Sequence, residues 1–352
     1  MSIHHQIIAL DVMGGDFGPE VVIPAAALAL DDMSGKISYI FFGDENRIKP
    51  LLGKYKVLEG ISEIHHTSGI VTNDEKPSVA IRRKDTSLRL AIEAVKEGRA
   101  QSIVSAGNTG ALMATAKLVL RCLPGIKRPA LASVLPTRQG DTVMLDLGAN
   151  LVCDAQMLVQ FAVLGSVYAR VVKGIDTPRV GILNVGSEDM KGPDLVREAA
   201  SILTNIVFPG DYYGFVEGDD LAEGLVDVVV TDGFTGNIAL KVAEGVSKLT
   251  SHYMKEAFLS SLPAKMGAVL AGCALKKVKK RMDPRYYNGG MFLGLDGICV
   301  KSHGGMDVYG VSRAILVAAH LVEQGYNSEV AHEIALVMNQ QSNGIEPEGV
   351  IA

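Results

Sequence analysis

The stretch IVSAGNTGAL, residues 103–112, ends an apolar run with small polar residues and glycines before a helix-like run begins. Its side chains include no obvious nucleophile or metal ligand. Backbone N–H groups at the start of a helix bind anions, and glycines let the backbone approach an anion closely. The stretch therefore predicts an anion-binding loop, which consists of Ser105, Gly107, Asn108, Thr109 and Gly110.

The same order of β-branched run, glycine-rich or polar loop and helical pattern occurs five times along the chain. The five segments begin IIALDVMGGDFGPE, IVSAGNTGALMATA, VMLDLGANLVCDAQ, VGILNVGSEDMKGPD and VDVVVTDGFTGNIAL. Runs such as VDVVV are apolar throughout, which is typical of strands covered on both faces. The alternation predicts a doubly wound, mostly parallel sheet in an α/β/α sandwich. We treat residues 1–352 as a single catalytic α/β domain.

In a parallel sheet the carboxyl ends of the strands lie along one edge, where ligands bind. We therefore expect the five loops to form one cleft for an anion such as phosphate, although tight turns alone would explain any single glycine loop. Asp11, Asp146 and Asp232 each end a strand-like run, and a capping role is an equal alternative for them. The residues expected to line this cleft are Asp11, Gly14, Gly15, Asp146, Asn150, Glu188 and Lys191.

Three adjacent cations, Arg82, Arg83 and Lys84, precede a helical pattern in KPSVAIRRKDTSLRLA. They are candidate phosphate ligands, and a solvated basic turn is the alternative interpretation. One of the next three residues, Asp85, Thr86 or Ser87, is expected to cap the helix. Other polar side chains have the chemistry to polarise a carbonyl group, namely Asn108, Thr109, Asn150, Asn184, Asn237 and His303.

The bulk properties exclude several classes of protein. A net charge of −5 argues against general nucleic-acid binding. The four cysteines lie far apart without a CxxC pair, and no secretory signal precedes Asp11, so we expect reduced thiols in a cytoplasmic protein. Cys153 is a conceivable nucleophile, but a buried core thiol is the favoured interpretation. The histidines show no metal-binding spacing, and we expect neither a metal nor a cofactor.

Residues 246–285 depart from the repeated pattern and are predicted to form a helical excursion, interrupted at Pro263. An apolar segment, MGAVLAGCAL, directly precedes the basic cluster KKVKKR. This combination suits contact with an anionic membrane surface or an acidic carrier protein, and a dimer-packing helix is the alternative. No apolar run reaches the roughly 20 residues that cross a bilayer. The candidate membrane-contact residues are Lys276, Lys277, Lys279, Lys280 and Arg281.

Taken together, the loop motifs resemble the bacterial phosphate acyltransferase family, PlsX, over essentially the whole chain. The motifs that carry the resemblance are DVMGGDFGPE, KPSVAIRRKDTSLRLA, VSAGNTGALMA, RPALASVLPT, LDLGANLVCDAQMLVQFAVLGSVYA, NVGSEDMKG, FVEGDDLAEGLVDVVVTDGFTGNIALKVAEG and HGG. The resemblance implies a fold similar to those of phosphotransacetylases and isopropylmalate dehydrogenases.

The resemblance also implies an activity, the transfer of a long-chain acyl group from acyl carrier protein to inorganic phosphate. The acyl phosphate product would then serve a downstream membrane acyltransferase that opens phospholipid synthesis. Members are homodimers without an organic cofactor, and they are cytoplasmic with peripheral membrane contact. On this basis Lys84, with Arg82 or Arg83, is expected to neutralise phosphate while the 105–110 loop binds its oxygens. The other catalytic candidates are Asn108, Thr109, Asp232, Asn237, Asn150 and His303.

Three other functions remain open from the residues. One is a phosphotransacetylase-like enzyme that uses coenzyme A and short acyl groups. Another is a decarboxylating dehydrogenase that uses NAD and a divalent metal. The last is a phosphate- or lipid-binding module without catalytic activity.

Overall fold

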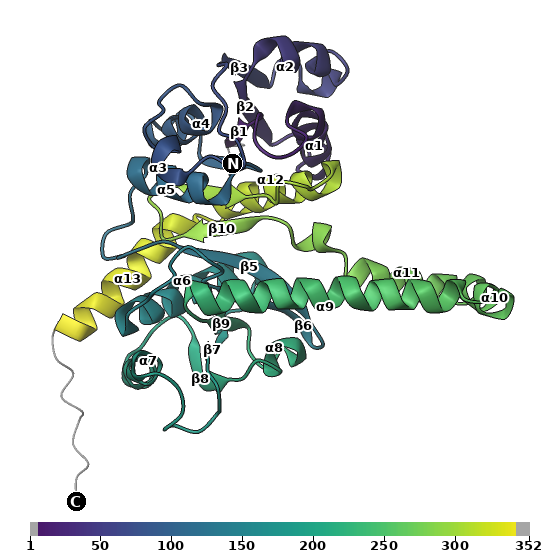
Figure 1. Cartoon of the computed structure of the whole chain (residues 1–352). Coiled ribbons are helices and arrows are strands. Elements are labelled where there is room, and N and C mark those ends of the chain that lie inside the picture. Colours follow the sequence, from purple (N-terminus) through teal and green to yellow (C-terminus); the bar gives the residue numbers. More distant parts are fainter. Residues whose placement is uncertain (1–5, 343–352) are drawn as a thin grey trace, which may run out of the picture.

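A computed structural model describes residues 6–342, and for Lys279 and Ser342 it describes the backbone alone. Eleven strands form one continuous sheet that runs through the molecule (Figure 1). In sheet order they are β3 (Ser62–His66), β2 (Ile37–Gly43), β1 (Gln6–Asp11), β4 (Ser102–Ser105), β11 (Ile298–Lys301), β10 (Gly290–Leu293), β5 (Ala130–Thr137), β6 (Gly140–Leu145), β9 (Val228–Val230), β7 (Arg179–Leu183) and β8 (Asp211–Val216).

Strand direction changes in the middle of this sheet. The strands from β3 to β11 are mutually parallel, and so are those from β6 to β8. Between them, β10 is antiparallel to both β11 and β5, and β5 is antiparallel to β6. The predicted mostly parallel sheet is confirmed, but β6, β9 and β7 run opposite to β1, β4 and β11.

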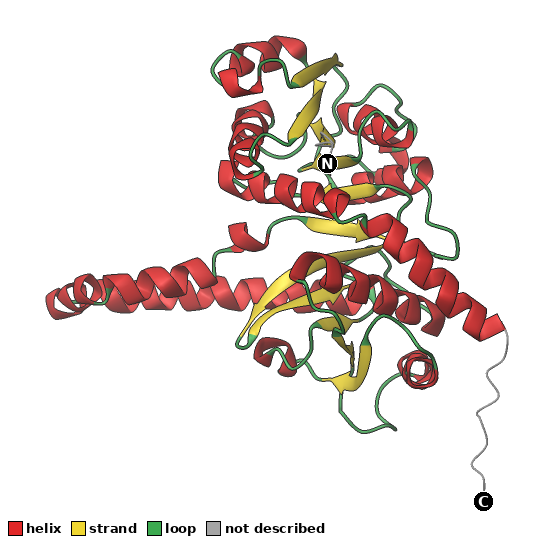
Figure 2. Ribbon diagram, turned by 180° about the vertical axis from the view of Figure 1, so that it is seen from behind, coloured by secondary structure: helices red, strands yellow, loops and turns green. Residues whose placement is uncertain are grey.

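Helices cover both faces of the sheet, as predicted for an α/β/α sandwich (Figure 2). The largest hydrophobic cluster packs one group of helices on one face, and two smaller clusters pack the other group on the opposite face. The first group is α1 (Pro19–Asp32), α2 (Glu45–Leu52), α6 (Ala155–Lys173), α7 (Asp194–Asn205), α12 (Val308–Glu323) and α13 (Tyr326–Ser342). The second group is α3 (Pro77–Ala80), α4 (Ser87–Lys96), α5 (Thr109–Val119), α8 (Asp220–Glu223) and α9 (Gly233–Leu259). A short 3₁₀ turn, η1, spans Lys56–Leu58.

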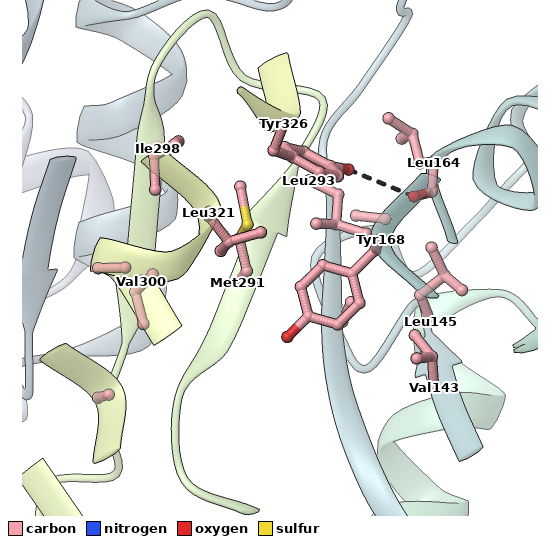
Figure 3. Close-up of a cluster of buried hydrophobic side chains, with 14 of the residues drawn as sticks. Val143, Leu145, Leu164, Tyr168, Met291, Leu293, Ile298, Val300, Leu321 and Tyr326 are labelled. Atoms are coloured by element: carbon pink, nitrogen blue, oxygen red, sulfur yellow. Dashed lines mark hydrogen bonds between the residues drawn. The ribbon is translucent and has the colours of Figure 1, made fainter. Parts of the chain in front are cut away.

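The centre of the core joins α6 to the antiparallel strands (Figure 3). Met291 and Leu293 of β10 point to the α6 face, whereas Phe292 between them packs on the opposite face. The Tyr326 hydroxyl donates a hydrogen bond to the Leu164 carbonyl oxygen at 3.3 Å. Because successive strand residues alternate between faces, apolar residues throughout β10 satisfy both helical layers.

One helix, α6, is long and apolar enough to cross a membrane by length and composition, but 78% of its apolar window is buried inside the protein. It packs against β6, β9, α7 and α13. These contacts identify α6 as the central core helix of the sandwich.

The predicted excursion is a long helical hairpin that projects from the body (Figures 1 and 2). Its first helix, α9, begins at Gly233, so the helix predicted after VDVVVTD continues without a break into the excursion. The Asp232 carboxylate accepts the Thr235 N–H and caps this helix. The break falls at residues 260–261, and Pro263 lies in the first turn of α10, where its missing N–H costs nothing. The return path consists of α10 (Leu262–Leu270), α11 (Gly272–Arg281) and the 3₁₀ turn η2 (Pro284–Tyr287).

Candidate functional site

The carboxylate of Asp11, at the end of β1, is buried and joins three segments of the chain. It accepts hydrogen bonds from the Ser87 hydroxyl at 2.6 Å and the Ser105 hydroxyl at 2.7 Å. Burial raises the pKa of this carboxyl above its ordinary value, and the two serine hydrogen bonds and the charge of Lys301 oppose that rise. Asp11 therefore positions the loop after β4 and the start of α4.

The loop after β4 opens α5 and lies against the loop after β1. A Cβ atom on Gly14 would lie 2.8 Å from the Gly107 nitrogen, so the two backbones meet at a distance that only glycine permits. Thr109 is exposed at the first position of α5. The N–H groups of Thr109 and Gly110 belong to the first helical turn, where no helical carbonyl reaches them. These two donors and the positive end of the helix dipole are therefore suited to an anion.

The side chain of Asn108 is fully used in holding this loop. Its Oδ1 accepts the Ala111 N–H at 3.0 Å and caps α5. Its Nδ2 donates to the carbonyl oxygens of Asn73 and Glu75, each at 2.9 Å. Asn108 was predicted to be a catalytic donor, but these bonds make it a positioning residue that ties the 72–75 segment to the helix start.

The loop after β11 completes this group and brings in a partly buried cation, Lys301. Its ammonium group donates to the carbonyl oxygens of Ala106, at 3.3 Å, and Ser302. Burial lowers the pKa of Lys301 to about 8, although Asp11 and Asp16 favour its charged form. The adjacent Gly304 carbonyl accepts the Asp16 N–H at 3.0 Å, which joins this loop to the β1 loop.

The exposed His303 lies in the same loop, and Asn288 fixes its backbone. The Asn288 Oδ1 accepts the His303 N–H at 2.9 Å, and its Nδ2 donates to the Ser302 hydroxyl at 2.8 Å. The Nδ1 of His303 accepts the Gly305 N–H at 3.2 Å. The Nε2 of the neutral ring therefore carries the proton and can donate it to an oxygen.

The three cations that were predicted to bind phosphate have different environments. Arg83 is committed to the protein, since it donates to the Ile70 carbonyl at 2.7 Å and forms a 3.2 Å ion pair with Glu75. Arg82 and Lys84 are exposed. Their segment lies beside the loop, because α3 packs on α5 and a Cβ atom on Gly110 would lie 2.8 Å from Pro77. Thr86 caps α4 by accepting the Arg89 N–H, as one of the three cap candidates was expected to do.

A second group of predicted residues lies at the carboxyl ends of β6, β9 and β7. The buried Asp146 organises the 147–150 turn there. Its Oδ1 accepts the N–H groups of Leu131, Gly148 and Ala149, and its Oδ2 accepts the backbone and side-chain N–H groups of Asn150. With both oxygens occupied, Asp146 holds the turn rather than a substrate.

Asp232 and Asn237 belong to the start of α9, next to this turn. The Asn150 carbonyl accepts the Gly233 N–H at 2.8 Å, and a Cβ atom on Gly148 would lie 3.3 Å from the Asn237 Nδ2. Glu188 and Lys191 form an exposed 3.9 Å ion pair in the loop after β7. Asn184 in that loop donates to the carbonyl oxygens of Gly186 and Lys191, each at 3.1 Å.

The expectation that all five loops share one edge of the sheet is wrong, because strand direction reverses at β10 and β5. One set of strand ends carries Asp11, Gly14, Gly15, Ser105, Gly107, Asn108, Thr109, Gly110 and His303. The opposite set carries Asp146, Asn150, Asp232, Asn237, Glu188 and Lys191. The antiparallel pairs β5–β6 and β10–β11 are hairpins with short connections, at residues 138–139 and 294–297, whereas β10 pairs with β5 across a long stretch of sequence that no local pattern predicts.

Sequence reasoning missed Lys301, and its position offered a signal. It directly follows the apolar run ICV and precedes SHGG, which is the same strand-to-loop change that marked Asp11. Asn288 offered no such signal, because only the pairing of β10 with β11 brings it to His303. Within residues 6–342, no three His, Cys, Asp or Glu side chains are grouped where they could hold a metal ion.

Replacing Cys153 with alanine is expected to leave the rate of acyl transfer within about twofold of the original. The thiol is buried, and burial raises its pKa to about 12, so the thiolate is scarce at neutral pH. Steady-state kinetics of the variant measure the effect. A loss of more than about a hundredfold with an unchanged melting temperature would assign Cys153 a catalytic role.

Comparisons with known proteins agree with this architecture. The fatty acid synthesis protein family matches residues 7–329. The phosphate acyltransferase of Rhodospirillum centenum is 54% identical over 347 residues, which cover 98% of each chain. That of Rhodospirillum rubrum is 54% identical over 332 residues, covering 94% of this chain and 95% of the relative. A solved phosphotransacetylase from Streptococcus pyogenes shares the fold, with a TM-score of 0.63 and 19% identity over 90% of this chain and 94% of that one. The chain therefore belongs to the phosphate acyltransferase family that its motifs predicted, and it is an acyltransferase.

Proposed function

We propose that the protein transfers a long-chain acyl group from acyl carrier protein to inorganic phosphate and releases an acyl phosphate. This proposal rests on the contacts that bring the loops after β1, β4 and β11 together around the start of α5. Two first-turn N–H groups, the helix dipole and the Lys301 cation together suit a phosphate dianion. The exposed Arg82 and Lys84 would add positive charge from the neighbouring segment.

The reaction balances without a further reactant. A phosphate oxygen forms a bond to the thioester carbonyl carbon, and the carbon–sulfur bond breaks. The proton of hydrogen phosphate moves to the departing sulfur, so the products are an acyl phosphate and a free thiol. The enzyme has to position phosphate and stabilise the developing oxyanion. The Nε2–H of His303 and the hydroxyl of Thr109 are the proposed oxyanion donors.

The second group of residues is proposed to bind the acyl donor. Leu131 of β5 packs into both smaller hydrophobic clusters, one formed with α5 and the other with α9. The sheet surface between these helices therefore connects the phosphate loop with the start of α9. A thioester that lies along this surface would have its acyl chain beside Asn237 and Asn150, with Asp232 orienting α9.

Incubation with palmitoyl-acyl carrier protein and phosphate, followed by hydroxylamine trapping, tests the proposal. We expect palmitoyl hydroxamate in amounts that depend on both substrates. The phosphotransacetylase-like alternative, favoured by the shared fold, predicts hydroxamate from acetyl-coenzyme A and phosphate instead. Absence of product from both donors would refute phosphate acyl transfer.

The tip of the hairpin supports the proposal of peripheral membrane contact. The residues Leu262, Met266, Val269 and Leu270 of α10 are between 68% and 86% exposed. Delivery at a bilayer to a membrane acyltransferase would suit a poorly soluble acyl phosphate. The basic residues contribute less than predicted, since Arg281 donates to the carbonyl oxygens of Thr137 and Arg138 on the body. Of the others, Lys276, Lys277 and Lys280 are exposed.

The double substitution Val269→Glu and Leu270→Glu is expected to abolish flotation with liposomes that contain anionic lipid. Two buried apolar contacts with the acyl region are lost, and two carboxylates are repelled by the lipid charge. Liposome flotation with and without anionic lipid measures the effect. Lys276→Gln is the control for charge alone, and unchanged flotation of the double variant would refute tip insertion.

A homodimer is proposed from an apolar stripe along α9. Phe234, Ile238, Val242, Val246, Leu249 and Tyr253 recur every three or four residues and are each about half exposed or more. This spacing places them on one side of the helix. Long exposed apolar stripes mark protein interfaces, and the same stripe on a second copy is a matching partner.

We expect Val246→Glu to convert the dimer to a monomer, because each copy would bury an unpaired carboxylate in the apolar contact. Sedimentation velocity measures the change. Glu244→Gln, on the same helix outside the stripe, should stay dimeric. A wild-type monomer, or a Val246→Glu variant that remains dimeric, would contradict the assignment of this interface.

A further inference from the structure

A cavity of about 560 Å³ lies between α6, α11, α12 and η2, over the β5–β6 hairpin. Its walls carry five cations, Lys173, Lys277, Lys280, Arg281 and Arg313. The only acidic side chain among the lining residues is Asp141. The lining therefore has a formal charge of +4, five minus one, in a protein whose net charge is −5.

These cations are not neutralised by carboxylates within the described part of the chain, because none of the five belongs to an ion pair there. Arg281 uses one nitrogen, Nη2, on two carbonyl oxygens. The Lys280 ammonium lies 5.4 Å from the centre of the Tyr286 ring. The buried Nε of Arg313 has no hydrogen-bond partner. Several charged donors therefore remain available to a ligand in this cavity.

Such an arrangement opposes folding unless an anion binds. Like charges around a concave, partly dry surface repel more strongly than charges in water. Burial lowers the pKa of Lys173, and the carboxylates of Asp227 and Asp141 partly oppose that shift. The five side chains line one cavity from two helices of the body and one of the hairpin, and Lys277 and Lys280 among them are also exposed to solvent. A polyanion would reduce the repulsion, and it would accept a hydrogen bond from the Nε–H of Arg313.

The remaining lining favours an organic ligand over a bare inorganic anion. Three tyrosines and three valines form it together with the cations, namely Tyr168, Tyr286, Tyr287, Val134, Val172 and Val317. The volume falls within the range of about 300–1,000 Å³ that is typical of small-molecule sites. The predicted phosphate loop does not line this cavity, although Asn288 lines it and also accepts the His303 N–H in the loop after β11.

We propose that this cavity is a second ligand site, which binds a small organic molecule bearing two or more phosphate groups. The cations bind the phosphates, and the tyrosines and valines contact the organic part. The site is separate from the proposed acyl transfer, so a failure of either leaves the other standing. Coenzyme A and ADP both carry this chemistry, and coenzyme A differs from ADP by a 3′-phosphate and a pantetheine group.

Isothermal titration calorimetry of the full chain with coenzyme A, ADP, pyrophosphate and adenosine tests the proposal. We expect coenzyme A or ADP to bind at least about tenfold more tightly than pyrophosphate or adenosine. Arg313→Gln should weaken that binding at least about tenfold, because it removes a charge-assisted contact. Lys276→Gln on the exposed surface of α11 should not change it. Thr109→Ala in the phosphate loop should not change it either.

A second variant keeps the test decisive if Arg313→Gln fails to fold. Lys277 and Lys280 are exposed on α11, so the double substitution Lys277→Gln and Lys280→Gln should fold and weaken binding by a similar factor. Failure of both coenzyme A and ADP to bind would overturn the proposal. Binding that survives the double substitution, or pyrophosphate binding as tight as that of the organic ligands, would also overturn it.

Discussion

Replacement of Lys301 with methionine is expected to lower kcat/KM for inorganic phosphate by about a hundredfold, the effect of removing one preorganised charged donor from a reaction site. Lys301 is the partly buried cation of the joined loops, and methionine keeps most of its apolar length. The Asp11 carboxylate retains its hydrogen bonds from Ser87 and Ser105, so the loops should stay folded. Steady-state kinetics with phosphate as the varied substrate measure the loss, and thermal unfolding checks the fold.

The same residue predicts a pH dependence. Lysine is charged below its pKa, and burial places that pKa at about 8. As the pH rises through about 8, Lys301 loses its charge and KM for phosphate should rise. The Lys301→Met variant should show a flat KM over this range. The exposed Lys96, replaced with methionine, is the control, and it should behave as the original protein does. A Lys301→Met variant with more than half of the original kcat/KM would remove Lys301 from the site.

The second large effect is expected for Asn108→Ala, with turnover falling about ten- to a hundredfold and stability falling by about 1 kcal/mol. The stability loss is that of a helix cap. The loss of turnover follows from releasing the 72–75 segment, which the Asn108 amide holds through the carbonyl oxygens of Asn73 and Glu75. Loss of the cap predicts a measurable drop in melting temperature.

Asn108→Ser separates the two roles of this side chain. Serine caps helices about as well as asparagine, but its hydroxyl cannot replace the two amide bonds to residues 73 and 75. We therefore expect near-normal stability and a turnover almost as low as that of Asn108→Ala. If Asn108→Ser has normal turnover, the cap is the only role of Asn108, and the tie to the 72–75 segment is irrelevant to catalysis.

The sequence by itself determined the features that depend on neighbours along the chain. The cap at Thr86, one of three adjacent candidates, and the start of a helix after the 105–110 loop both follow from hydrogen bonds and backbone preferences within a few residues. The repeated strand, loop and helix pattern likewise indicated the α/β/α sandwich, because period and burial are local properties of each element. The loop motifs identified the family because each motif is also a local stretch of sequence.

Only the tertiary structure decided which loops meet. The reversal of direction at β10 and β5 separates Asp146 and Asp232 from the phosphate loop, although every one of these strands looks alike in the sequence. Pairing of β11 with β4 brings Lys301 to the loop of Ala106, and pairing of β10 with β11 brings Asn288 to His303. Strand pairing between distant segments depends on the packing of whole faces rather than on local preference. For that reason the sequence predicted the chemistry of each loop, but it did not predict which other loops lie beside it.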